Sequence, residues 1–321
     1  MPGQVERFSI GGVLYCSGSK DGPGQTRNDA HMDITHRDPP LRRLSALLIV
    51  LLIPLASVTV EANALERLFA PKAERWAFWD SRDPGATQQI DHSSWNTFLG
   101  QYVLQGEDGI NRVRYSSVSD TDRQQLGEYI DALEQIPIRR YTREQQLAYW
   151  INLYNAVTVD VVLQHYPIKS IRDIDISPGF FADGPWGKKL LSIEGQAVSL
   201  NDIEHRILRP VWQDPRLHYA LNCASLGCPN LSNSAYIADS IDPQLEQAAT
   251  DYINNPRGVS FKNGKLSVSS IYSWFRDDFG KSDSAVIDHL QHYAAVPLKD
   301  SLADTGHISA YHYDWSLNDA P

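Results

Sequence analysis

The chain has 321 residues, of which 42% are hydrophobic and 21% are charged, and its formal net charge is −10. These proportions are ordinary for a globular protein. The negative charge argues against a nucleic-acid partner, because phosphate contacts need clustered Lys and Arg, and the sequence has no such cluster. We therefore expect the partner to be a small molecule or another protein.

The amino-terminal region predicts export. Arg42 and Arg43 precede an apolar run from Leu44 to Val60, which is followed by Ala62-Asn63-Ala64. A basic segment, an apolar segment and small residues at a cleavage site are typical of a secretory signal peptide. The alternative is a membrane anchor, but Pro54 within the run and the adjacent A-x-A pattern favour cleavage.

The methionines set the predicted boundaries. Met1 and Met32 are the only ones, and a start at Met32 gives a leader of ordinary length. We interpret residues 1–31 as lying upstream of the true start, residues 32–64 as the signal peptide and residues 65–321 as the mature globular domain. The mature protein is then periplasmic or secreted, with no membrane span after cleavage.

Periodicity and turn residues predict most of the remaining elements. In chain order they are a helix near 93–105, a short strand near 113–118, a helix near 121–135, a hairpin of 189–193 with 197–200, a helix near 243–254, a hairpin of 259–262 with 265–268, helices near 270–279 and 284–293, and a strand within 308–317. The second hairpin carries Asn263-Gly264, the dipeptide most typical of a two-residue turn.

The clearest helix is predicted between Thr142 and Pro167. Thr142 and Gln145 have the spacing of a capping box at its start. Apolar residues lie on almost every face of this helix, which is typical of burial in the middle of a domain. The predicted fold is therefore α+β: a single helix-rich domain with a small, mostly antiparallel sheet and a central buried helix.

Two further elements surround the cysteines. Asn201, with Glu204 three residues later, predicts the capped start of a short helix that ends at Pro210. Residues 217–223 are predicted to form a buried strand, and a turn of small residues then leads to Cys228.

Three motifs together resemble the family known as domain of unknown function 547 (DUF547). They are LAYWINLYNAVTV, VSLNDIEHRILRP and LHYALNCASLGCPNL, and the later YDWSLND fits as well. The resemblance covers about residues 143–318. It implies a domain but no reaction, because the function of the family is not established.

Cys223 and Cys228 are the only cysteines of the predicted mature domain. In an oxidising compartment, such a pair favours a structural disulfide. Alternatively, Cys223 is a nucleophile, since a nearby imidazole or a run of backbone N–H groups activates a thiol. The turn after Cys223 is then expected to form an oxyanion hole.

His205 is the candidate base for Cys223, and Asp202, one helical turn earlier, is the candidate residue that orients its imidazole. The alternative is an ordinary pair of helix side chains. The sequence thus leaves two hypotheses: a thiol-dependent hydrolase or acyl transferase, and a non-catalytic exported binding domain whose cysteines form a disulfide. Neither hypothesis needs a cofactor.

A third interpretation is a zinc site made by His205, His218, Cys223 and Cys228. These side chains have suitable ligand chemistry, but their spacing matches no common zinc framework. Alternation along the predicted strand would also point His218 and Cys223 to opposite faces. Zinc therefore stays a minor alternative.

Asn152 and Asn155 lie one turn apart on the apolar central helix. A buried amide must form hydrogen bonds or it destabilises the fold. Either both side chains bind the backbone of a neighbouring loop, or they orient a substrate or His205 beside the cysteines.

Overall fold

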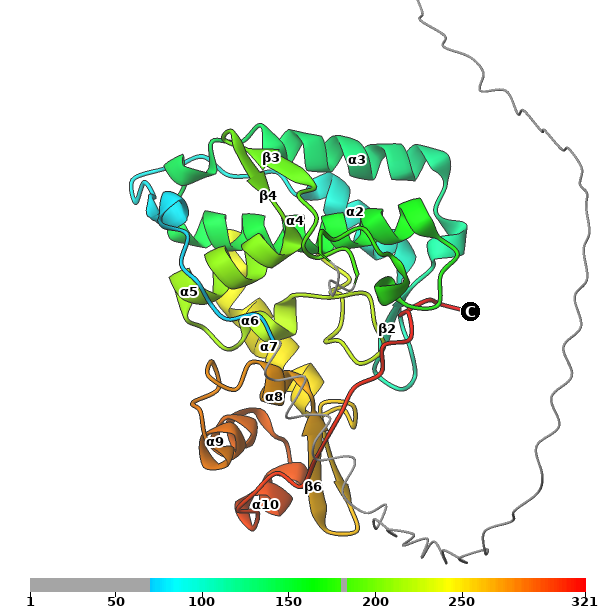
Figure 1. The fold of residues 1–321 in the computed structure, drawn as a ribbon, viewed down its shortest axis with the longest axis vertical. Coiled ribbons are helices and arrows are strands. Elements are labelled where there is room, and N and C mark those ends of the chain that lie inside the picture. The colour runs from blue at the N-terminus through cyan, green and yellow to red at the C-terminus, as the bar shows by residue number, and fades with distance from the viewer. Residues whose placement is uncertain (1–69, 180–183) are drawn as a thin grey trace, which may run out of the picture. The chain divides into compact units, whose positions relative to one another are not determined.

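Helix α4 (Arg143–His165) runs through the middle of the fold, and its buried side chains lie on every face (Figure 1). The Thr142 hydroxyl accepts a hydrogen bond from the backbone N–H of Gln145, which confirms the predicted N-cap. The Gln145 side chain, however, accepts from the backbone N–H of Ile90, so the second half of the predicted capping box is wrong. The helix ends at His165, as Pro167 predicts.

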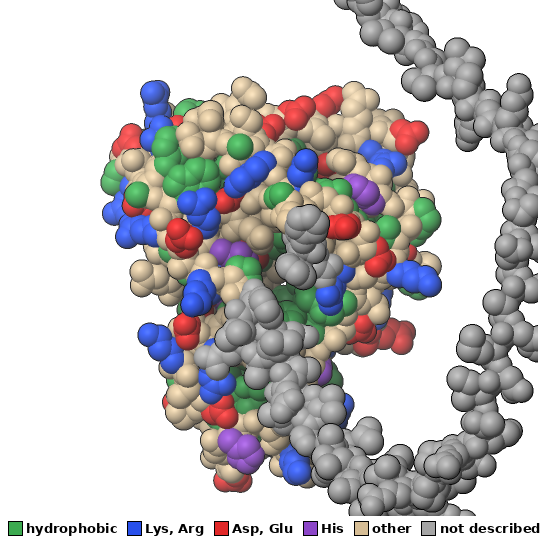
Figure 2. All heavy atoms as spheres, in the orientation of Figure 1, with side chains coloured by type: hydrophobic (Ala, Val, Ile, Leu, Met, Phe, Trp, Pro, Cys, Tyr) green, Lys and Arg blue, Asp and Glu red, His purple; other side chains and the backbone are tan. Residues whose placement is uncertain are grey.

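The computed structural model describes residues 70–179 and 184–321. The predicted start at Met32, the signal peptide and its cleavage site lie outside these ranges. Within them, no helix has the length and apolar character needed to cross a bilayer. In Figure 2, acidic and basic side chains are interspersed over the visible face.

Shorter helices surround α4. Before it come η1 (Ala77–Asp80), α2 (Ser93–Tyr102), η2 (Tyr115–Ser117), α3 (Asp120–Glu134) and η3 (Ile138–Arg140). After it come η4 (Ile171–Asp173), η5 (Asp202–Leu208), α5 (Arg209–Trp212), α6 (Leu217–Ala220), η6 (Ala238–Ser240), α7 (Ile241–Ile253), α8 (Ile271–Trp274), α9 (Asp283–Tyr293) and α10 (Leu298–Ala303). α3 packs along α4 and completes one hydrophobic core, while α7, α8 and α9 enclose a second.

The strands are short and mostly antiparallel. β1 (Val103–Gln105) pairs with β2 (Asn111–Val113), β3 (Leu191–Ile193) with β4 (Gln196–Val198), and β5 (Val259–Lys262) with β6 (Lys265–Ser269). β7 (Ala310–His312) adds to β6 in parallel. Asn263 and Gly264 both have positive φ angles, as the predicted turn requires. The predicted helix-rich α+β fold is confirmed, although its strands form three separate small sheets.

The predicted strand before Cys223 is wrong. Residues 217–220 form the short helix α6, and residues 221–223 belong to no helix or strand. All four side chains of α6 are buried. An apolar run that is buried on all sides has the same pattern in a strand and in a helix, so periodicity does not distinguish them.

The helix that carries Glu204 and His205 also differs from the prediction. Asn201 makes no capping hydrogen bond; instead, the Ser199 hydroxyl accepts from the backbone N–H of Asp202, and the Asp202 carboxylate accepts from that of Ser199. This reciprocal pair is a capping box.

The same helix continues past Pro210 because its middle, η5, is π-helical. Pro210 has no N–H to donate to the carbonyl of Arg206. That carbonyl accepts from the N–H of Trp76 instead, and the carbonyl of His205 accepts from that of Glu74. The segment before η1 therefore supports η5, and π-helical turns occur frequently at functional sites.

Candidate functional site

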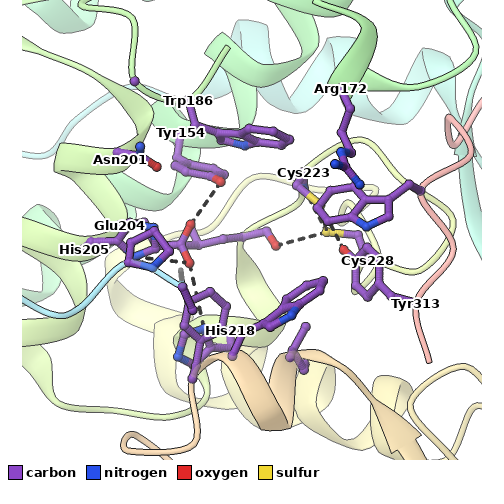
Figure 3. A pocket seen from close by; sticks show the side chains of 18 of the residues that line it. Tyr154, Arg172, Trp186, Asn201, Glu204, His205, His218, Cys223, Cys228 and Tyr313 are labelled. Atoms are coloured by element: carbon purple, nitrogen blue, oxygen red, sulfur yellow. Dashed lines mark hydrogen bonds and ion pairs between the residues drawn. The ribbon is translucent and has the colours of Figure 1, made fainter. Parts of the chain in front are cut away.

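A cavity of about 590 Å³ lies between α4, η5, α8 and the loop of residues 223–228, which we call the cysteine loop. Its polar and charged lining comes from Arg172, Ser177, Asn201, Glu204, His205, His218, Cys223 and Cys228, and its aromatic lining from Tyr154, Trp186, Trp274, Phe275, Tyr313 and Trp315. Glu204, His205 and His218 are grouped on one side, and the two cysteines with Tyr313 on the other (Figure 3). The structure thus brings His205 and Cys223 to one cavity.

Cys223 has a set of close polar partners. Its Sγ lies 2.8 Å from Sγ of Cys228 and 3.0 Å from the Tyr313 hydroxyl. The Ser225 hydroxyl is 3.3 Å away. Both cysteines are free thiols, since a disulfide bond is about 2.05 Å long.

These partners favour the thiolate of Cys223. Burial alone would raise the pKa of Cys223, but hydrogen bonds from Cys228, Ser225 and Tyr313 together lower it below the ordinary value. The pKa of Cys228 is raised, first by burial and then by the adjacent Cys223. Burial also keeps the pKa of Tyr313 well above its usual range, so its hydroxyl stays a donor.

The cysteine loop does not form the predicted oxyanion hole. Four of its backbone N–H groups are donated inside the protein: Ala224 to Asn222 Oδ1, Leu226 to Ser316 O, Gly227 to Asp314 O and Cys228 to Ser225 O. A side chain at Gly227 would meet the backbone N of Asp314 at 2.6 Å. Residues 313–318 therefore lie directly against the loop, which leaves these amides no room for a substrate oxygen.

The His205 imidazole has partners other than Cys223. Its Nδ1 is 3.0 Å from Nη1 of Arg209, which can only donate, so the Nδ1 lone pair is occupied. Burial lowers the pKa of His205 to about 4 against the opposing charge of Glu204, and the ring is neutral at pH 7. Within the described ranges, His205 forms no hydrogen bond to Cys223.

The Asp202 carboxylate bonds groups other than His205. Its carboxylate accepts from the Ser199 backbone and hydroxyl, from Lys189 and from Arg206. Burial would raise the pKa of Asp202, but these hydrogen bonds outweigh it and lower the pKa. Asp202 therefore stabilises the start of the helix.

The structure supplies a different carboxylate–imidazole pair. Nε2 of His218 lies 2.7 Å from Oδ2 of Asp278, which also accepts from Arg209 at 2.6 Å. Burial would raise the pKa of Asp278, but these two partners lower it, so the group is a carboxylate and Nε2 donates. Nδ1 of His218 then faces Glu204, 4.0 Å away, and the ring stacks on Phe275 at 4.3 Å.

Sequence reasoning missed this pair for identifiable reasons. His218 was assigned to the far side of a strand that does not form, and Asp278 is 60 residues away in the chain. The sequence pattern assigned Glu204 only to the start of a helix. Its position next to His205 could have indicated that both side chains line the same site. Tyr313 opens the YDWSLND motif, but nothing in that motif indicates a contact with Cys223.

Asn152 and Asn155 both bind backbone, the first of the two interpretations. Asn152 bonds the carbonyl and the N–H of Tyr236, at 2.8 and 2.9 Å. Asn155 donates to the carbonyl of Ala220 and accepts from the N–H of Asn222, both at 2.9 Å. Asn155 thereby fixes the chain directly before Cys223 to the central helix.

The candidate zinc ligands do not form a metal centre. Among the described residues, no group of three or more His, Cys, Asp or Glu has a metal-binding arrangement. The histidines bond Arg209 and Asp278, whereas the two cysteines bond each other. Because residues 217–220 form a helix, the His218 side chain lines the cavity. It does not bond the sulfur atoms of Cys223 or Cys228.

Fold and site together define a helix-rich α+β protein with a thiol at the wall of an aromatic cavity. Residues 138–253 match the model of the family described as "Protein of unknown function, DUF547". The match confirms the resemblance over residues 143–253, and for residues 254–318 the resemblance stays a prediction. No curated protein and no solved structure matches the chain.

Proposed function

We propose that the protein is a thiol-dependent hydrolase or acyl transferase with Cys223 as its nucleophile. The observation that supports this proposal is the setting of the Cys223 sulfur, which lies within hydrogen-bond distance of Cys228, Ser225 and Tyr313 at the wall of the cavity. A thiolate is the nucleophilic form of cysteine, and donors of this kind favour it without a neighbouring imidazole.

The reaction has two steps. The sulfur attacks the carbonyl carbon of an ester or thioester, an S–C bond forms, and the bond to the leaving group breaks as that group takes a proton. Water or another acceptor then attacks the acyl-enzyme, loses a proton and releases the Cys223 thiolate. His218 is oriented by Asp278 and lines the same cavity, so we assign it the transfer of these protons.

Turnover of p-nitrophenyl esters and acyl thioesters by the protein tests this proposal. We expect an acyl adduct on Cys223 by mass spectrometry and loss of both adduct and turnover in Cys223→Ala. His218→Gln should slow turnover without preventing the labelling of Cys223. Turnover that persists in Cys223→Ala, or an absence of acyl adduct with every substrate, would contradict it.

The second candidate is a non-catalytic binding domain with a Cys223–Cys228 disulfide. The short distance between the two sulfur atoms supports it, since oxidation would need little movement. Titration of the native protein, purified without reductant, separates the candidates. Two free thiols favour the catalytic thiol, and none favours the disulfide.

We also propose that the protein is exported to the periplasm or secreted. The support is Arg42-Arg43, the apolar run to Val60 and the A-x-A pattern that ends at Ala64. Amino-terminal sequencing of the protein made in its native host should begin at Leu65. A sequence that begins at Met1 would refute both the start site and the cleavage.

A further inference from the structure

We propose that the cavity binds an organic cation, with its ammonium group at Glu204 and its apolar part against the aromatic wall. The inference deepens the proposed function and rests on it in one respect, since it takes this cavity as the substrate site. It names the class of substrate: an acyl compound that carries an amine.

Glu204 lacks the cationic partner that Asp202 and Asp278, the enclosed carboxylates nearest to it, both have. Its side chain is 12% exposed, and its single hydrogen bond comes from the Tyr154 hydroxyl at 3.1 Å. Across residues 70–179 and 184–321, no Lys or Arg reaches it within 4 Å, whereas Asp202 is paired with Lys189 and Arg206. A carboxylate removed from water without a cation is costly, so the site favours a ligand that supplies one.

The two neighbouring histidines do not replace that cation. Nδ1 of His205 is 3.8 Å from Glu204 and already accepts from Arg209, whose charge is balanced by Asp278. Nδ1 of His218 is 4.0 Å from Glu204, beyond hydrogen-bond reach. The carboxylate therefore keeps hydrogen-bonding capacity toward the cavity that it lines.

The opposite wall suits the rest of such a ligand. Trp274 packs on Tyr313 at 4.8 Å and on Trp315 at 5.7 Å between ring centroids, and Tyr313 on Trp315 at 4.7 Å. Aromatic faces attract cations as well as apolar groups. The protein itself uses one of these rings in that way, since the Arg172 guanidinium lies 5.2 Å from the Trp315 centroid.

The position of Cys223 fits this orientation. Its sulfur bonds Tyr313, a member of the aromatic wall, and Glu204 lies on the other side of the cavity (Figure 3). A ligand whose ammonium group meets Glu204 would extend across the cavity and bring its acyl group to the thiol.

Calorimetric titration at pH 7.5 with 2-phenylethylamine, 2-phenylethanol and phenylacetate tests the inference. The amine should bind at least about 10-fold more tightly than the alcohol, because a charge-assisted hydrogen bond replaces a neutral one. Glu204→Gln should remove this preference and leave the affinity for the alcohol unchanged. Glu128→Gln, which alters an exposed carboxylate on α3, is the matched control and should retain the preference.

Phenylacetate binding as tightly as the amine, or a preference for the amine that survives in Glu204→Gln, would overturn the inference. If Glu204→Gln fails to fold, the ranking of the three probes on the unaltered protein still decides. None of the probes carries an acyl ester, so the outcome does not depend on reactivity of Cys223. Failure here and failure of the proposed thiol chemistry are therefore distinguishable.

Discussion

At the scale of single residues, the main finding is a cysteine whose pKa is lowered by hydrogen bonds and not by an imidazole partner. The sequence identified Cys223 as a candidate nucleophile, because a cysteine in a small-residue turn is a recognisable feature. It did not identify the groups that lower the pKa of Cys223. Tyr313 is 90 residues away, and no local pattern encodes a contact of that range.

The Tyr313 hydroxyl should control the reactivity of Cys223. Tyr313→Phe removes one donor to the sulfur, so the pKa of Cys223 should rise, and the midpoint of iodoacetamide labelling against pH should move upward. His205→Ala should move this midpoint less, because His205 makes no hydrogen bond to the sulfur. Tyr293→Phe removes a hydroxyl that bonds Glu246 and serves as the control. Equal midpoints for Tyr313→Phe and the unaltered protein would contradict the assignment.

At the scale of elements, the sequence predicted what a strong local signal encodes. The cap at Thr142 and the apolar faces of α4 defined that helix, and Asn-Gly defined the β5–β6 hairpin. The short apolar run of α6 has no distinctive period, which explains the wrong strand. The π-helical turn of η5 depends on hydrogen bonds from Glu74 and Trp76, which are distant in sequence.

Asn155 should matter more for stability than its exposed neighbours on α4. Asn155→Leu leaves the buried carbonyl of Ala220 and the N–H of Asn222 without partners, which should lower the free energy of unfolding by about 2–4 kcal/mol. Gln164→Leu, at an exposed position of the same helix, should change it by less than about 0.5 kcal/mol. Urea unfolding measures both, and equal midpoints for the two variants would show that Asn155 does not anchor the cysteine loop.

At the scale of the whole molecule, the composition and the hydrophobic pattern of the sequence were enough to predict the fold class. They were not enough to predict the cavity, whose lining comes from segments between Ala70 and Trp315. The same assembly buries histidines, and burial is the main cause that lowers the pKa values of His92, His205 and His289 to about 4.

Buried histidines make stability depend on pH in one direction. The unfolded chain binds protons at these sites with the ordinary pKa of 6.5, while the folded protein stays neutral down to about 4. The unfolded state therefore takes up more protons between these limits, and the free energy of unfolding should fall as the pH drops from 6.5 to 4.

Urea unfolding across this pH range checks the dependence. His92→Gln removes one buried site and should reduce the slope, whereas His165→Gln, at an exposed position of α4, should preserve it. A stability that is constant between pH 6.5 and 4 would contradict the assignment of neutral, buried rings.

The contact between Cys223 and Tyr313 has a consequence for biosynthesis. Because 90 residues separate them, a nascent chain contains both cysteines long before it contains the hydroxyl that favours the thiolate. Until synthesis has passed Tyr313 and residues 313–318 have docked on the loop, the sulfur of Cys223 lacks that donor. On the proposed mechanism, full nucleophilicity of Cys223 would therefore arise late, once Tyr313 has been translated and residues 313–318 have docked.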